Sequence, residues 1–128
     1  MKITFTNEEA QQHFHSAMCN GLGYIAGYDL ELKFNRETYS ETSAKMSGVT
    51  QFGVCHEDVL LQMLKDGHTI SLYDWNDDVV NTISIQDVYD RMPLVSVRHL
   101  LDMIEERDDA DTADAILQTV FLGEVVYG

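Results

Sequence analysis

The stretch TISLYDWNDDVVNTISI, residues 69–85, decides the fold of this chain. Apolar and polar residues alternate on both sides of Asn76-Asp77-Asp78, which is the pattern of half-buried strands. Asn and Asp accept the backbone conformations of tight turns. The sequence therefore predicts a β-hairpin in which Thr69–Trp75 and Val79–Ile85 are joined by a three-residue turn.

A helix is predicted on each side of this hairpin. Before it, Glu57–Lys65 ends at Gly67 and carries an apolar stripe on one face. The stripe consists of Val59, Leu60, Met63 and Leu64. After it, Ser84-x-x-Asp87 has the form of a capping box, and Pro93 ends the short helix that follows. The run from Glu57 to Met92 is therefore expected to form a helix–hairpin–helix segment.

The N-terminal part predicts two more strands and two more helices. Lys2–Phe5 alternates as a short strand, and Thr6-x-x-Glu9 forms a capping box that begins a helix. We expect this helix to end at Asn20-Gly21 and a strand to follow over Tyr24–Phe34. Asn35 is placed to cap a helix over Arg36–Met46. The first helix has an apolar stripe of Ala10, Phe14, Ala17 and Met18.

The C-terminal part predicts two helices and a short tail. One helix begins at Ser96, and its expected inward residues are Val97, Leu100, Leu101 and Ile104. Asp111 or Thr112 is expected to cap the last helix, which Gly123 ends. The expected stripe of this helix is Ala113, Ile116, Leu117, Val120 and Phe121. Glu124–Tyr127 is either a closing edge strand or a tail packed by Val125, Val126 and Tyr127.

Together these elements predict one α+β domain over residues 1–128, with a small antiparallel sheet and helices packed mainly on one face. A chain of 128 residues is long enough to bury its own core. No apolar signal segment or membrane span is evident, and two cysteines, Cys19 and Cys55, do not form a disulfide framework. We expect a cytoplasmic protein with free thiols.

Charge is distributed very unevenly along this chain. The formal net charge is −14: residues 1–56 hold six acidic and four basic residues, and residues 57–128 hold sixteen acidic and four basic ones. This excess argues against direct binding of nucleic acid.

No catalytic or metal motif stands out. His13 and His15 are two residues apart and point to different faces of a helix. A thiol–imidazole pair would require Cys19 or Cys55 to meet His15, His68 or His99 in space. The acidic clusters do not follow a calcium-loop template. We therefore expect no cofactor, metal ion or catalytic residue.

Three segments give a family resemblance. CNGLGYIAGYDLEL (residues 19–32), DVYDRMPLVSVRHLLDMI (87–104) and DDADTADAILQTVFLGEVVYG (108–128) resemble short, uncharacterised acidic proteins of bacterial genomes and their phages or mobile elements. The resemblance implies a phage-type or accessory protein and brings no activity or functional residues with it.

Three functions follow from these observations. The first is a non-enzymatic inhibitor or adaptor whose acids bind a basic, nucleic-acid-binding protein. Its expected contact residues are Asp102, Glu105, Glu106, Asp108, Asp109, Asp111 and Asp114, and then Asp74, Asp77 and Asp78. The second is a small-molecule binding domain or unrecognised enzyme whose pocket holds a histidine with Tyr24, Tyr28, Tyr39 and Trp75. The third is a self-assembling structural protein that pairs through Val125–Tyr127.

Overall fold

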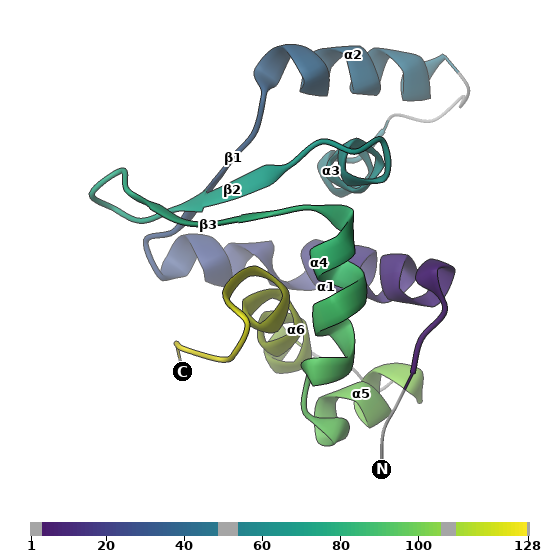
Figure 1. Ribbon diagram of the computed structural model, residues 1–128, viewed down its shortest axis with the longest axis vertical. Coiled ribbons are helices and arrows are strands. Elements are labelled where there is room, and N and C mark those ends of the chain that lie inside the picture. The colour runs from purple at the N-terminus through teal and green to yellow at the C-terminus, as the bar shows by residue number, and fades with distance from the viewer. Residues whose placement is uncertain (1–3, 49–53, 106–109, 128) are drawn as a thin grey trace.

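The computed structural model describes residues 4–48, 54–105 and 110–127, and the prediction of an α+β fold is confirmed (Figure 1). The elements in chain order are α1 (Asn7–Gly27), β1 (Glu31–Lys33), α2 (Arg36–Ser47), α3 (His56–Lys65), β2 (Ile70–Tyr73), β3 (Val79–Ile83), α4 (Ile85–Arg91), a 3₁₀ turn η1 (Met92–Leu94), α5 (Val97–Ile104) and α6 (Ala110–Leu122).

The sheet has three antiparallel strands in the order β1-β2-β3. The hairpin prediction is confirmed, since Ile70 pairs with Ile83 in the β2–β3 ladder. Both strands are shorter than predicted, and a bulge lies opposite Leu72 and Tyr73. Asp77 adopts a left-handed conformation with φ 66°, which an Asp at a turn tolerates.

One face of the sheet is buried against the helices. Ile70, Leu72 and Ile83 are fully buried and belong to one apolar core cluster with residues of α1, α3, α4 and α6. Figure 1 shows α1 and α6 beneath the sheet and α2 above it, beside α3. The other face carries polar groups, including a 2.8 Å hydrogen bond between the Ser71 and Thr82 hydroxyls. This alternation follows from the two-residue period of a strand.

The first helix is longer than predicted. Its capping box is confirmed, because the Glu9 N–H donates to Thr6 Oγ1 at 3.1 Å and the Thr6 N–H donates to Glu9 Oε1 at 2.9 Å. The predicted end at Asn20-Gly21 is wrong, since α1 continues to Gly27. Asp29, with φ 61°, follows the end of the helix.

The predicted strand over Tyr24–Phe34 is therefore reduced to β1 at Glu31–Lys33. Its first half lies in α1 instead, where Gly21 and Ile25 are buried. Packing against another helix accounts for this difference, because local turn signals yield to tertiary contacts that bury apolar surface.

That other helix is α6. A Cβ added to Gly21 would lie 3.0 Å from both Ala113 Cβ and Leu117 Cδ1, so the two helices cross closely where Gly21 has no side chain. Phe14 and Phe121 also meet across this interface, with ring centroids 6.1 Å apart. The predicted stripes of α1 and α6 are confirmed, because every residue of both is buried.

The helices around the hairpin agree with the sequence patterns. Asn35 caps α2 by accepting from the Thr38 N–H at 2.9 Å. The stripe of α3 is buried as predicted, and α4 begins at the predicted Ser84 capping box. Both α3 and α4 pack against α1, so the helix–hairpin–helix run is not set apart as a subunit.

Three predictions near the chain ends are wrong. In α5 only Leu100 of the expected inward residues is buried, together with Met103. In α6 the helix begins at Ala110, and Thr112 is buried inside it rather than capping it. Thr4 and Phe5 are not in a strand, while Lys2 and Ile3 lie outside the described residues. The residues predicted to face inward in α5 have helical spacing, but the helix packs through the side that holds Leu100 and Met103.

Substituting Gly21 tests the α1–α6 crossing. We expect Gly21→Val to lower the free energy of unfolding by about 1–3 kcal/mol, because its side chain would press on Ala113 and Leu117. Gly23→Val is the matched control, since a Cβ there meets nothing within 4 Å. Urea unfolding followed by circular dichroism measures both. Equal stability of the two variants would contradict a close crossing at Gly21.

Candidate functional site

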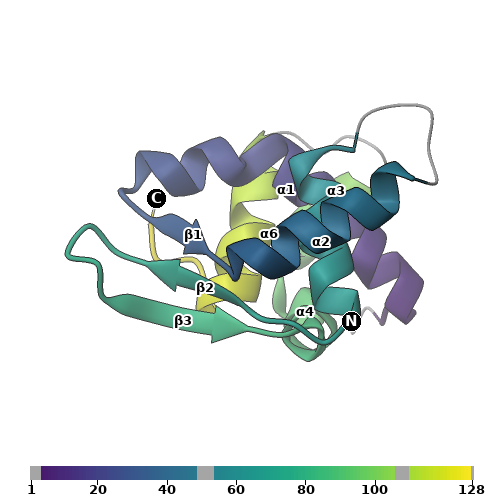
Figure 2. The ribbon, with the colours of Figure 1, turned by 90° about the horizontal axis from the view of Figure 1, so that it is seen from above.

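The acidic residues of the hairpin lie at its tip. The Asp74 carboxylate holds the turn by accepting from the N–H groups of Asn76 at 2.9 Å and Asp78 at 3.1 Å. Asp77 forms an ion pair with Lys33 of β1. Figures 1 and 2 both show the turn projecting beyond the rest of the molecule. Trp75 is also at this tip, and 78% of it is exposed.

The acidic residues of α5 and α6 have more varied surroundings. Asp102 and Glu105 lie on and just after α5, and Asp111 is exposed in the first turn of α6. Asp114 is half-buried and accepts from the Tyr28 hydroxyl at 2.7 Å. The remaining three predicted contact residues, Glu106, Asp108 and Asp109, lie outside the described residues.

The α5 carboxylates and those of the hairpin occupy different regions of the molecule. Figure 1 places the hairpin tip beyond one end of the sheet and α5 at the far end of the helical layer. Asp102 and Glu105 therefore lie away from the carboxylates of the hairpin tip.

The structure brings a thiol, an imidazole and a carboxylate together at the contact of α1 with α3. Cys19 Sγ lies 3.9 Å from Nδ1 and 4.0 Å from Nε2 of His15, which precedes it by one helical turn. His15 Nε2 is 2.5 Å from Asp58 Oδ1. The sequence offered His15 as one of several partners for Cys19, but nothing in it pointed to Asp58, because the two helices meet only in the folded chain.

This arrangement does not activate the thiol. The sulfur is nearly equidistant from both ring nitrogens, so the lone pair of the unprotonated nitrogen is not aimed at it as general-base catalysis requires. Burial raises the pKa of Cys19, and the neighbouring Glu57 and Asp58 carboxylates raise it further. A catalytic thiol needs the opposite shift, which exposes a thiolate near neutral pH.

The aromatic residues expected to line a pocket are dispersed. Tyr39 stacks on Phe34, with ring centroids 5.0 Å apart, and its hydroxyl lies 2.8 Å from His56 Nδ1. Tyr28 stacks instead on Tyr127 at 4.9 Å. Trp75 is at the hairpin tip and Tyr24 is exposed on α1. A shallow cavity of about 500 Å³ beside Phe34 and His56 is lined mainly by apolar residues of α1 and β1.

The C-terminal tail is held by a buried amide. It is not a strand, and of the three residues predicted to pack it only Tyr127 lies against the core, because Val125 and Val126 are exposed. Gln118 Oε1 accepts from the N–H groups of Val126 and Tyr127, each at 2.8 Å, and its Nε2 donates to the Tyr127 carbonyl at 2.9 Å. The tail and β3 border a groove of about 300 Å³, which is lined by Val80, Asn81, Leu122, Val126 and Tyr127.

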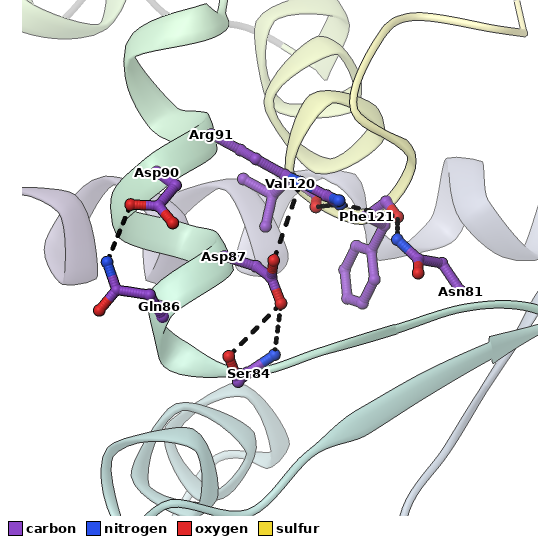
Figure 3. A network of polar contacts seen from close by, with 8 residues as sticks. All are labelled: Asn81, Ser84, Gln86, Asp87, Asp90, Arg91, Val120 and Phe121. Atoms are coloured by element: carbon purple, nitrogen blue, oxygen red, sulfur yellow. Dashed lines mark hydrogen bonds and ion pairs between the residues drawn. The ribbon is translucent and has the colours of Figure 1, made fainter.

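A polar network fixes β3 and α4 to the end of α6 (Figure 3). Arg91 Nη1 donates to the Val120 carbonyl and Asn81 Nδ2 donates to the Phe121 carbonyl, both at 2.7 Å. Asp87 lies between Ser84, whose N–H it accepts at 2.8 Å, and Arg91, at 3.9 Å. A cation and an amide thus satisfy helix-terminal carbonyls, which carry partial negative charge.

Across residues 4–48, 54–105 and 110–127, no three His, Cys, Asp or Glu side chains are grouped so that they could hold a metal ion. None of the helices described combines the length and apolar character that crossing a membrane requires. No protein-family model, curated protein or solved structure matches this chain.

Alkylation of Cys19 tests whether its thiol is activated. In a Cys55→Ser background, we expect iodoacetamide to modify Cys19 with a pH profile displaced above that of free cysteine, because its pKa is raised. Asp58→Asn removes one of the responsible charges and should speed alkylation at a fixed pH. Mass spectrometry gives the rates. If His15→Ala slowed the reaction, His15 would be activating the thiol, contrary to this interpretation.

Titration of Tyr28 tests its contact with Asp114. The hydrogen bond to Asp114 raises the pKa of Tyr28 to about 12. Tyrosinate absorbance should therefore show a late ionisation that Tyr28→Phe removes and that Asp114→Asn moves to lower pH. Since the folded pKa exceeds the ordinary value of 10.0, this contribution to stability is complete below about pH 10 and is lost toward about pH 12. Absence of the late ionisation in the wild type would contradict the contact.

Proposed function

We propose that this protein is a non-enzymatic binding protein, an inhibitor or adaptor, that engages a basic, nucleic-acid-binding protein through its acidic surface. The observation that carries the proposal is the projecting hairpin tip. It holds Asp74, Asp77 and Asp78 around an exposed Trp75, with Lys33 paired to one of the three carboxylates.

The residue types at this tip suit a protein partner. Tryptophan is among the commonest hot-spot residues of interfaces. Trp75 is 78% exposed, so a partner that covers it would remove its apolar surface from water and thereby stabilise the complex. Carboxylates beside it attract lysine and arginine side chains, and a Trp face also binds these cations. A formal charge of −14 would accelerate the encounter with a basic partner at low salt.

Comparison with the other two functions favours binding. The thiol beside His15 has a raised pKa, and the aromatic residues are dispersed, which gives an enzyme or small-molecule site little support. Self-assembly would bring strongly acidic copies together, and their mutual repulsion opposes it.

Neutralising the hairpin tests the proposal. Asp74→Asn/Asp77→Asn/Asp78→Asn keeps the turn, because Asn supplies the same acceptor and tolerates the same backbone. The assay is displacement of labelled duplex DNA from a histone-type basic protein. We expect the wild type to displace DNA at low salt but not at high salt, and the variant to do so several-fold less well.

The matched control is Glu8→Gln/Glu37→Gln/Glu41→Gln, which removes the same charge from exposed positions in α1 and α2. It should displace DNA almost as well as the wild type. No displacement by the wild type would remove the proposed function. Equal losses in the two variants would assign the effect to net charge rather than to the hairpin.

A further inference from the structure

Strand β3 is an open edge of the sheet. Within the described residues, the strand order leaves no strand on its far side, and Figure 2 shows no helix of this part of the chain beside that edge. Among the described residues, β3 makes no backbone hydrogen bond outside the sheet. Alternate N–H and C=O groups of an edge strand point away from its neighbour, so β3 is a template for one more strand.

Apolar surface accompanies this edge. The groove between β3 and the tail, here called the β3 groove, is lined on its two sides by Val80 and Val126. Val79 and Val80 are 55% and 41% exposed, and Val125 and Val126 are 56% and 57% exposed. Of these, Val80 and Val126 border the groove, remain in contact with water and would be covered by a segment seated between them.

The charges around the groove favour a cationic occupant. Asp74 and Asp78 close the turn at one end of β3, and Glu124 precedes the tail valines. The nearby bases are engaged, Lys33 with Asp77 and Arg91 with the end of α6. A second copy of this chain would bring the same carboxylates face to face, so charge complementarity selects a basic partner instead.

We infer that the β3 groove binds an extended segment of another protein, with alternating cationic and apolar side chains, which adds to the sheet as a strand beside β3. The inference rests on the proposed function, because it specifies how a basic partner would bind. Backbone hydrogen bonds would hold the segment, its apolar side chains would cover Val80 and Val126, and its cations would reach Asp74 and Asp78.

A pair of synthetic peptides tests strand addition. The first is a short peptide of alternating lysine and valine, and the second is the same peptide N-methylated at alternate residues, which keeps charge and side chains but blocks one edge of the strand. We expect the first to bind, measured by fluorescence anisotropy, and to slow amide hydrogen exchange at Val79–Ile83. The second should bind at least about tenfold more weakly, because it cannot form the backbone hydrogen bonds to β3. A tenfold change corresponds to about 1.4 kcal/mol.

Two lysine variants test the location. Val80→Lys places a positive charge in the β3 groove, while Val97→Lys places it on α5 at the same exposure, 41% against 40%. Both change the net charge equally, and circular dichroism shows whether both fold. We expect Val80→Lys to weaken peptide binding about tenfold and Val97→Lys less than about twofold. Should Val80→Lys fail to fold, hydrogen exchange of the wild type with the peptide pair still decides the question.

The outcomes separate this inference from the proposed function. Salt-sensitive binding that ignores N-methylation and leaves the β3 amides unprotected would overturn strand addition and leave the acidic binding protein intact. A larger effect of Val97→Lys would move the docking surface to α5 and overturn the inference. If the protein alone forms a dimer in analytical ultracentrifugation and hydrogen exchange shows the same amides protected without peptide, the groove would belong to a second copy. That result would also overturn the inference.

Discussion

The close crossing of α1 and α6 is the contact on which the remaining structure depends. Gly21 lets the two helices approach, and the paired stripes around Phe14 and Phe121 fill the space on either side. This helix pair forms the layer on which the buried face of the sheet rests. Arg91 and Asn81 then join the end of α6 to α4 and β3, so the helical layer and the hairpin are positioned by one another.

Much of the fold could be predicted from local signals. The capping boxes at Thr6 and Ser84 and the stripes of α1, α3 and α6 depend on neighbours within one or two turns, and all are present. The end of α1 could not be predicted, because Asn20-Gly21 is a strong local stop that a distant helix overrides. The inward side of α5 was also missed, since periodicity gives an apolar stripe but not what will cover it.

The candidate sites depend on contacts across long sequence separations, which limited their prediction. The acidic turn at Asp77 was visible in the sequence, but its ion pair with Lys33 was not. The same applies to Asp58 beside His15 and to Asp114 beneath Tyr28. The β3 groove requires Val80 and Val126 to face one another, although the two Val-Val pairs at 79–80 and 125–126 are a signal that sequence reasoning could have used.

The Gln118 amide has a chemical consequence for the lifetime of this surface. It is completely buried, and its Nε2 also donates to both Asp114 carboxylate oxygens at 3.1 Å. Deamidation to glutamate would set a second anion against Asp114 and turn the donor to the Tyr127 carbonyl into an acceptor. Chemical ageing at this one side chain would therefore remove one of its three hydrogen bonds to the tail and loosen that wall of the groove, while leaving the β3 wall in place.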